Sequence, residues 1–281
     1  EYHNGQSETL VRVSAAAGIL YGGMLWLAAG SRTDRAVFTA PRRAYGGAEN
    51  NYNALEAAQK ERQRMKTISI LNLKGGVGKT FTAANMAYEL YRRGYKVLLL
   101  DNDKQGNLSK AYGRYDAESV APITKLLSGD WVHPDEIIQQ TDYEGIDIVT
   151  ANMSLFGATW NLTREESENQ LSRYEQLGKS KIEYHGDCTV WGKYDYCIID
   201  NPPDIGLNVL NALAITDEVI VPVKLDNYAL EGLDIVAEQI EDIKAFNPEI
   251  RLAGVLITSY QNTDGESAGV EWLEEQGVYN I

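Results

Sequence analysis

From residue 67 onward, short apolar runs alternate with longer stretches that have helical periodicity. The apolar runs predict strands at residues 67–73, 96–101, 146–150, 196–200, 218–223 and 251–258. The stretches between them predict helices at residues 80–93, 107–112, 123–127, 135–139, 163–177, 206–214, 230–246 and 267–276. Because repeated strand–helix units favour parallel strands, the sequence predicts an α/β fold with a doubly wound, mostly parallel sheet and helices on both faces.

Two of the predicted helices differ in character. The helix at 230–246 has one apolar stripe, formed by Leu233, Val236, Ile240 and Ile243. Such a stripe is typical of a helix packed on a sheet. Residues 163–177 are polar and charged instead, which predicts an exposed helix, and residues 178–193 follow no pattern and are expected to form a loop.

Residues 1–64 differ from the rest of the chain. They are rich in Ala, Gly and Arg and show no sustained period, and Met65 stands directly before the first predicted strand. We expect the native start at Met65, an N-terminal extension at 1–64 that is not part of the fold, and a functional domain at 65–281. Residues 13–29 are largely apolar, but a spanning helix needs about 20 residues, so no stable membrane insertion is expected.

Composition and charge narrow the class of protein. The chain has 281 residues, of which 44% are hydrophobic and 23% charged, as in globular proteins. Its net charge of −14 argues against a broad basic surface for nucleic acid, although a local basic patch stays open. Cys188 and Cys197 have no zinc or redox spacing and suit a reducing cytoplasm, where we expect the protein to work.

A glycine-rich loop lies between the first predicted strand and the first predicted helix. Its sequence from residue 74 is Lys-Gly-Gly-Val-Gly-Lys-Thr. Gly75, Gly76 and Gly78 let the backbone approach a ligand closely, and the amides with the helix N-terminus form an anion cradle. Lys79 would reach the β- and γ-phosphates and Thr80 would ligate Mg²⁺. The alternative is a glycine turn with two surface lysines.

This loop departs from the usual phosphate-binding pattern, because Leu73 stands where that pattern has glycine and Lys74 is additional. The segment is the deviant Walker A motif, and the sequence here resembles the ParA/MinD family of P-loop ATPases. The resemblance implies nucleotide contacts from Lys74, Gly75, Gly76, Val77, Gly78, Lys79, Thr80 and Phe81. It implies that Lys74 reaches the nucleotide of a partner subunit, so that ATP binding forms a homodimer. Phe81 replaces the family's second threonine, which should alter contact with the α-phosphate.

Two aspartates follow the second predicted strand. The segment at 101–107 reads Asp-Asn-Asp-Lys-Gln-Gly-Asn and resembles the family's Walker A′ motif. By this resemblance Asp103 positions the attacking water and Asp101 supports the Mg²⁺ region. Lys104 stands where the family usually has proline, so the loop is expected to be looser. On its own, the segment would suit an Asp/Asn/Gly turn equally well.

A third aspartate ends the strand at 196–200. The continuation Asp-Asn-Pro-Pro resembles the Walker B strand, with Asp200 expected to hold Mg²⁺ through a water. The resemblance also implies that Pro202 and Pro203 stiffen the turn that senses the γ-phosphate. Because strands of a doubly wound sheet bring their carboxyl ends to one edge, the three motifs are expected to meet there.

The resemblance also implies partners. ParA-like members bind DNA nonspecifically as ATP dimers and are released by a ParB-like activator, whereas MinD-like members bind membrane through a C-terminal helix. The Walker A′ form and the stretch at 216–232 favour the ParA type, while the acidic charge and the absence of Lys and Arg from 259–266 weaken the case for DNA. The chain is expected to stop before the family's last strand and helix, so the sequence leaves open whether the protein binds DNA or a membrane.

We therefore expect an ATPase of ParA type, a dimerisation switch that hydrolyses ATP with Mg²⁺ in plasmid or chromosome partitioning. A MinD-like positioning ATPase and a regulatory switch with little turnover remain alternatives. An iron-protein reductase of the same superfamily needs cluster cysteines, and Cys188 and Cys197 are not placed like them.

Overall fold

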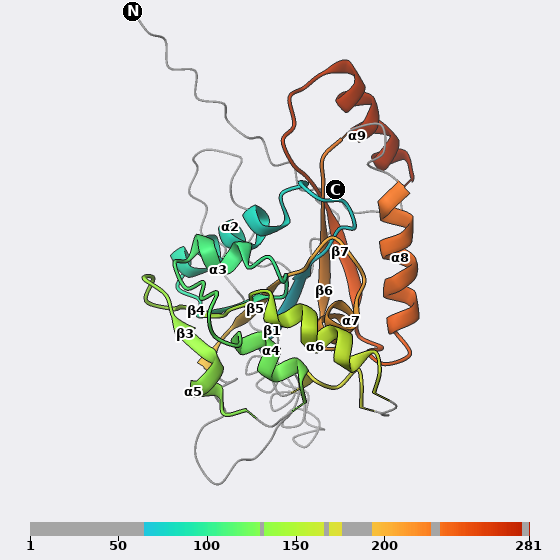
Figure 1. The fold of residues 1–281 in the computed structure, drawn as a ribbon. Coiled ribbons are helices and arrows are strands. Elements are labelled where there is room, and N and C mark those ends of the chain that lie inside the picture. The colour runs from blue at the N-terminus through green and yellow to red at the C-terminus, as the bar shows by residue number, and fades with distance from the viewer. Residues whose placement is uncertain (1–64, 130–131, 166–168, 176–192, 226–230, 277–280) are drawn as a thin grey trace, which may run out of the picture. The chain divides into compact units, whose positions relative to one another are not determined.

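The computed structural model describes residues 65–129, 132–165, 169–175, 193–225, 231–276 and 281. The predictions for residues 1–64 and for most of the loop at 178–193 lie outside them. The strands are β1 Lys66–Ile70, β2 Val97–Asp101, β3 Ile138–Gln140, β4 Ile146–Val149, β5 Tyr196–Asp200, β6 Glu218–Val223 and β7 Arg251–Ile257 (Figure 1). The helices are α2 Lys79–Arg92, α3 Asn107–Ala111, α4 Pro122–Leu127, α5 Pro134–Ile137, α6 Ser154–Leu162, α7 Leu207–Ala214, α8 Glu231–Ile243 and α9 Asp264–Gln276.

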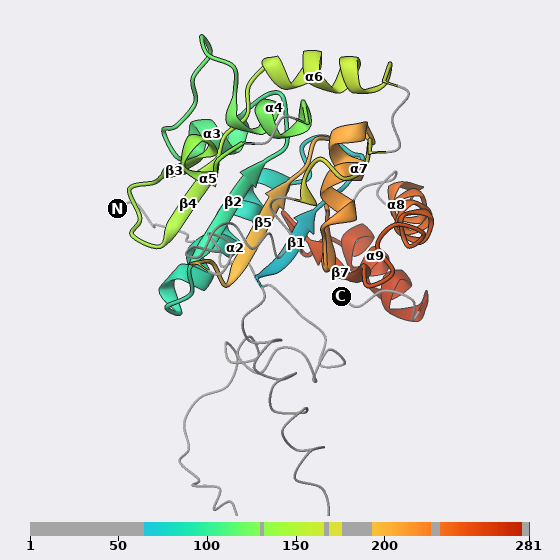
Figure 2. The same ribbon diagram turned by 90° about the horizontal axis from the view of Figure 1, so that it is seen from below.

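The strands form one sheet in the order β3-β4-β2-β5-β1-β6-β7. All neighbours are parallel except β3 and β4. The chain runs from β1 outward to β2 and β4, returns with β5 between β1 and β2, and then continues on the other side, as Figure 2 shows for β4, β2, β5 and β1. This winding confirms the predicted doubly wound, mostly parallel sheet.

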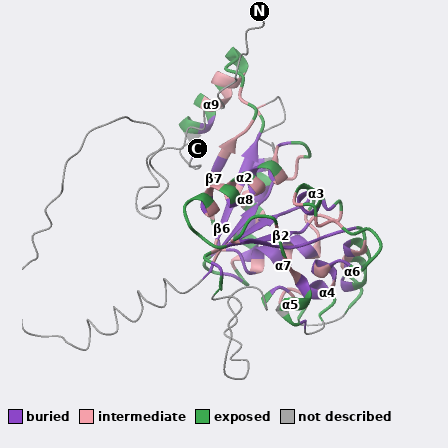
Figure 3. Ribbon diagram, turned by 90° about the vertical axis from the view of Figure 1, so that its left-hand side faces the viewer, coloured by how far each residue is buried: buried purple, intermediate pink, exposed green. Residues whose placement is uncertain are grey.

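Helices cover both faces of this sheet. Leu98 and Leu100 of β2 lie in a buried cluster with residues of α4, α6 and α7, whereas Val97 and Leu99 lie in a second cluster with residues of α2. Successive strand residues point to opposite faces, so the four consecutive apolar residues of β2 serve both cores. Buried residues accordingly concentrate along the strands in Figure 3.

The apolar stripe predicted on the late helix is confirmed. Leu233, Val236, Ile240 and Ile243 of α8 are all buried in a third cluster. They pack there with Val219 and Val221 of β6. The one-sided stripe therefore places α8 against the sheet, as such periodicity predicts.

The exposed helix predicted at 163–177 is wrong for the described residues, 163–165 and 169–175. They form turns, and the helix lies earlier, at α6. Tyr174 is fully buried, and its hydroxyl donates to Asn102 Oδ1 at 2.9 Å. The charged residues of this stretch dominated the prediction, whereas this one aromatic anchor draws the segment into the core.

The helix predicted at 135–139 is only partly correct. The structure has the single turn α5, followed directly by the edge strand β3, which pairs antiparallel with β4. Such a short edge strand gives a weak pattern because its three residues are half-buried or exposed.

Two further expectations concern membranes and cysteines. None of the helices in the described parts of the chain is long and apolar enough to cross a membrane. The apolar segment at 13–29 and Cys188 lie outside the described residues. Cys197 is a free, buried cysteine of β5, as predicted, and burial raises the pKa of its thiol to about 12.

Candidate functional site

The glycine loop connects the carboxyl end of β1 to the first residue of α2. Gly76 and Gly78 have φ angles of 73° and 88°, in the left-handed region that other residues rarely adopt. Gly78 is also the residue that caps the N-terminus of α2, and no side chain satisfies the amides there. Free amides at the positive end of a fourteen-residue helix attract an anion.

Neighbouring strands fix the shape of this loop. Asn72 accepts from the Lys74 amide at 2.8 Å and donates to the Pro222 carbonyl at 2.8 Å. Thr258, directly after β7, donates from its hydroxyl to the Val77 carbonyl at 2.8 Å. The loop is therefore tied to β6 and to the end of β7 through side chains that the motif does not include.

Lys79 lies at the centre of the site and is only 8% exposed. Its Nζ donates to the Lys74 carbonyl at 2.9 Å. Burial lowers the pKa of the Lys79 ammonium, and the carboxylates of Asp200, Asp103 and Asp204 oppose that shift. Acidic groups from two strand ends thus surround one buried cation, whose remaining donors can meet phosphate oxygens.

Asp101, the last residue of β2, is engaged by its own loop. Its Oδ2 accepts from the Ser109 amide at 2.8 Å and the Ser109 hydroxyl at 2.6 Å, and its Oδ1 accepts from the Asp103 amide at 3.2 Å. Burial raises the pKa of the Asp101 carboxyl to about 6, and these hydrogen bonds hold it from rising further. Asp101 therefore positions the segment that carries Asp103.

Gly106 closes the same loop and caps α3. Its φ is 61°, and a Cβ there would lie 2.5 Å from the Tyr115 ring and 2.7 Å from the Ala151 carbonyl. Only glycine fits this position. Asp103 accepts from the Gln105 amide at 2.9 Å, so the loop is a tight turn despite the lysine at 104.

Asp200 ends β5, in register with Ile70 of β1 and Asp101 of β2. Both of its carboxylate oxygens are buried, and neither has a hydrogen-bond partner among the described residues. Burial raises the pKa of the Asp200 carboxyl to about 7, although the nearby Thr80 hydroxyl and Lys79 lower it. An unpaired buried carboxylate of this kind is costly unless a cation or a donor meets it.

A cavity of about 540 Å³ opens between the glycine loop and the loops that follow Asp101 and Asp200. Most of the predicted nucleotide contacts line it, namely Gly75, Gly76, Gly78, Lys79, Thr80 and Phe81, and so does Asp103, the residue expected to position the attacking water. Lys74 and Val77 contribute through their carbonyls, which hold Lys79 and Thr258. Lys104 and Asp204, which the sequence did not single out as site residues, line the cavity as well.

The chemistry of this cavity fits a magnesium nucleotide. The described residues contain no group of three His, Cys, Asp or Glu that would hold a metal alone. The Thr80 hydroxyl and the orphaned Asp200 carboxylate supply hard oxygen donors, and Mg²⁺ commonly combines one or two such donors with phosphate oxygens and water.

Comparison with known proteins identifies the family. A family model described as an AAA domain matches residues 65–252. The sporulation initiation inhibitor protein Soj of Bacillus subtilis (strain 168) is 35% identical over 215 residues, which is 76% of this chain and 79% of that protein. The chain belongs to the ParA/MinD family of P-loop ATPases. The chromosome-partitioning ATPase Soj of Thermus thermophilus is 33% identical over 220 residues, 76% of each chain.

Solved structures agree with this membership. The cobyrinic acid a,c-diamide synthase of Mycobacterium smegmatis, crystallised with ADP and magnesium, has a TM-score of 0.65 at 30% identity and covers 77% of this chain and 83% of its own. The ATP complex of a Cyanothece McdA variant has a TM-score of 0.63 over 78% and 82%, but at 23% identity it shows the fold alone. Family membership and fold thus agree that this chain is a P-loop ATPase.

An asparagine network beneath the site of this ParA/MinD-family chain was missed from the sequence. Asn102 donates to Asn201 Oδ1 at 2.8 Å and to the Asn208 carbonyl at 3.1 Å, and it accepts from the Tyr174 hydroxyl. It therefore joins the ends of β2 and β5 to α7. One signal was available, because an Asp-Asn pair ends both strands, at Asp101 and Asp200.

Proposed function

We propose that this chain is an ATP-driven dimerisation switch of ParA type that acts in the partitioning of plasmid or chromosomal DNA. The observation that carries the proposal is the deviant lysine loop, which shares one cavity with Asp103. Asp200 ends the neighbouring strand beside Lys79. Similarity to the partitioning proteins described above supports the same conclusion.

Each side chain has a role that follows from charge. Lys79 and the loop amides bind the β- and γ-phosphates, while Thr80 and Asp200 would hold Mg²⁺. When bound, Mg²⁺ neutralises charge on the transferred phosphoryl group. Asp103 orients the attacking water, and Asp101 supports the metal region by fixing the loop of Asp103. Catalysis then consists mainly of positioning and electrostatic stabilisation.

Lys74 completes the site of a second copy. In this proposal its side chain reaches the nucleotide of the partner subunit, so ATP is shared across a homodimer and hydrolysis separates the pair. Its backbone is held in the loop beside the cavity, because its carbonyl accepts from Lys79 Nζ and its amide donates to Asn72 Oδ1.

Sizing chromatography with and without ATP tests the switch. The unaltered chain is expected to elute as a dimer only with Mg²⁺ and ATP. Lys79→Ala is expected to stay monomeric because the phosphates lose their cation. Asp103→Ala is expected to dimerise but not to hydrolyse, because only the water loses its partner. A stable ATP-dependent dimer of Lys79→Ala would contradict the mechanism.

The DNA matrix and a ParB-like activator belong to this proposal. An electrophoretic shift assay on nonspecific duplex DNA, run with ATP and with ADP, tests the first. Binding should require ATP and weaken steeply with salt, since phosphate contacts release counterions. No shift at low salt, combined with ATP-dependent binding to anionic vesicles, would favour a MinD-like role instead. The activator is tested by the rise in ATP turnover when a ParB-like protein is added.

We also propose that the ATPase domain begins at Met65 and that residues 1–64 lie outside it. Met65 is only 5% exposed and belongs to the core cluster of one sheet face. The family match begins at the same residue. The domain proposed is 65–281.

A further inference from the structure

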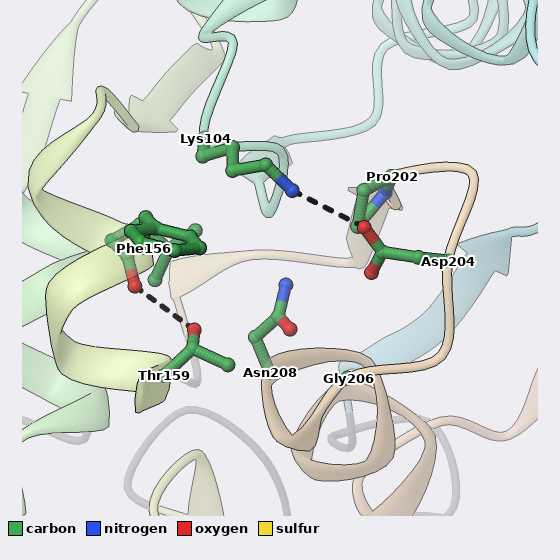
Figure 4. Close-up of a pocket in the computed structure, with 8 residues that line it drawn as sticks. Lys104, Phe156, Thr159, Pro202, Asp204, Gly206 and Asn208 are labelled. Atoms are coloured by element: carbon green, nitrogen blue, oxygen red, sulfur yellow. Dashed lines mark hydrogen bonds and ion pairs between the residues drawn. The ribbon is translucent and has the colours of Figure 1, made fainter. Parts of the chain in front are cut away.

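An ion pair joins the loop that carries Asp103 to the loop that follows Asp200. Lys104, in the loop after β2, places its Nζ 3.2 Å from Asp204 Oδ2, in the loop after β5 (Figure 4). Both residues line the nucleotide cavity. Both also line a second cavity of about 170 Å³, which Phe156 and Thr159 of α6 border.

Lys104 can leave Asp204 for another anion at little cost in stability. Its side chains are 33% and 50% exposed, and exposed ion pairs of this kind contribute little to stability. The Asp204 carboxylate lies close enough to act electrostatically on Lys79, at the base of the loop. Asp204 therefore carries its charge toward the region where phosphates would gather, and Lys104 is held beside it.

Binding of a nucleoside triphosphate is expected to weaken the ion pair between Lys104 and Asp204. A triphosphate brings negative charge next to Asp204, which repels it, and next to Lys104, which is attracted by it. A charged hydrogen bond from an ammonium group to phosphate is stronger than an exposed pair with a carboxylate. A diphosphate lacks the terminal group and disturbs the pair less.

We propose that Lys104 and Asp204 form a charge gate that makes the site discriminate ATP from ADP. With ATP, Lys104 leaves Asp204 and binds the terminal phosphate; with ADP, the pair stays closed. The inference rests on the proposed placement of the phosphates at the loop 74–80. Lys104 is then a specificity residue of this chain, standing where the family usually has proline.

Calorimetry on the full-length chain with Mg²⁺ tests the gate, using ADP and the nonhydrolysable analogue AMPPNP. Lys104→Met should lower the affinity for AMPPNP about tenfold, because one charged hydrogen bond is lost. It should lower the affinity for ADP less than about twofold. Lys104→Pro should behave in the same way. Asp204→Asn should tighten AMPPNP and leave ADP nearly unchanged, because it removes repulsion while keeping the side-chain shape.

Lys244→Met is the matched control, since Lys244 is also a surface lysine paired with one carboxylate, that of Glu241 on α8. It should alter neither affinity. Equal weakening of both nucleotides by Lys104→Met, or no weakening, would overturn the gate. A loss of AMPPNP affinity in Asp204→Asn would also overturn the gate, because the ion pair would then be needed to maintain the shape of the site.

A further variant separates this inference from the proposed site. Lys79→Ala should lose most affinity for both nucleotides, because it removes a contact that ADP also makes through its β-phosphate. If Lys79→Ala binds both normally, the phosphate placement fails and the gate fails with it. If Lys79→Ala loses both and Lys104→Met loses neither, only the gate is refuted.

Discussion

At the scale of single residues, the environment of Asp200 is unfavourable for a charged carboxylate. Its two oxygens are buried without hydrogen-bond partners in the described chain, and burial raises the pKa of its carboxyl to about 7. The folded protein therefore binds this proton more tightly than the unfolded chain does. The resulting stabilisation is fully present below the unfolded pKa of about 4 and is lost as the pH rises through about 7.

The first prediction follows from that sign. Asp200→Asn removes the buried charge, so it should stabilise the nucleotide-free protein at pH 8 by about 1–3 kcal/mol, and by less at pH 5. Thermal melts at the two pH values measure this. With Mg²⁺ and ATP the unaltered protein should be more stable than Asp200→Asn, because only the Asp200 carboxylate gains a cation.

Asp242→Asn is a suitable control, since Asp242 is an exposed residue of α8, remote in sequence from the site. It should change the melting temperature little at either pH. If Asp200→Asn lowers the stability of the nucleotide-free protein at pH 8, the carboxylate has a donor in solution and the argument for a cation site weakens.

Gly106 supports a second prediction at this scale. Gly106→Ala would force a Cβ against the Tyr115 ring and the Ala151 carbonyl in a left-handed conformation. We expect a loss of roughly 1–3 kcal/mol in the free energy of unfolding. ATP turnover should fall as well, because Asp103 lies in the same turn. Gly113→Ala, also at positive φ but with open space around it, is the control and should cost less than Gly106→Ala. Equal losses in the two variants would show that backbone strain alone, and not the contacts of Gly106, sets the effect.

At the scale of elements, a helix could be predicted where one of its sides is apolar and could not where apolar residues lie on both sides. The stripe of α8 was visible because its apolar residues recur on one face. In α6, Leu155 and Leu162 are buried while Phe156 and Trp160 are 56% and 59% exposed. Apolar residues on both faces leave no helical period, so this helix could not be seen in the sequence.

Tyr174 shows why the segment after α6 was predicted wrongly, and it can be tested. Its hydroxyl is the donor to Asn102 Oδ1, inside the network that links β2, β5 and α7. Tyr174→Phe keeps the ring but leaves a buried acceptor unpaired, which should cost about 1–2 kcal/mol by denaturant unfolding. Tyr88→Phe, at a residue 41% exposed on α2, should cost almost nothing. Equal effects would show that the hydrogen bond of the Tyr174 hydroxyl does not contribute to stability.

At the scale of the whole molecule, the sequence was sufficient to predict a mostly parallel, doubly wound sheet and the meeting of its three motifs, but not the edge strand β3. Strand–helix alternation predicts parallel strands, and parallel strands bring Ile70, Asp101 and Asp200 to one edge. The contacts that hold the loops there could not be predicted. Thr258 and Val77 are 181 residues apart, and Lys104 and Asp204 are 100 apart. Neither pair has a local pattern that would reveal it.

The last prediction concerns where the folded unit begins. A chain of residues 65–281 should match the full chain in melting temperature and in ATP turnover, because Met65 already packs in the core and β1 follows at once. A chain of residues 72–281 is the control, and it should not fold, since it lacks β1, which pairs with both β5 and β6 at the centre of the sheet. A fall of more than about 5 °C in the 65–281 chain, roughly 1–2 kcal/mol for a domain of this size, would show that residues 1–64 contribute to the fold.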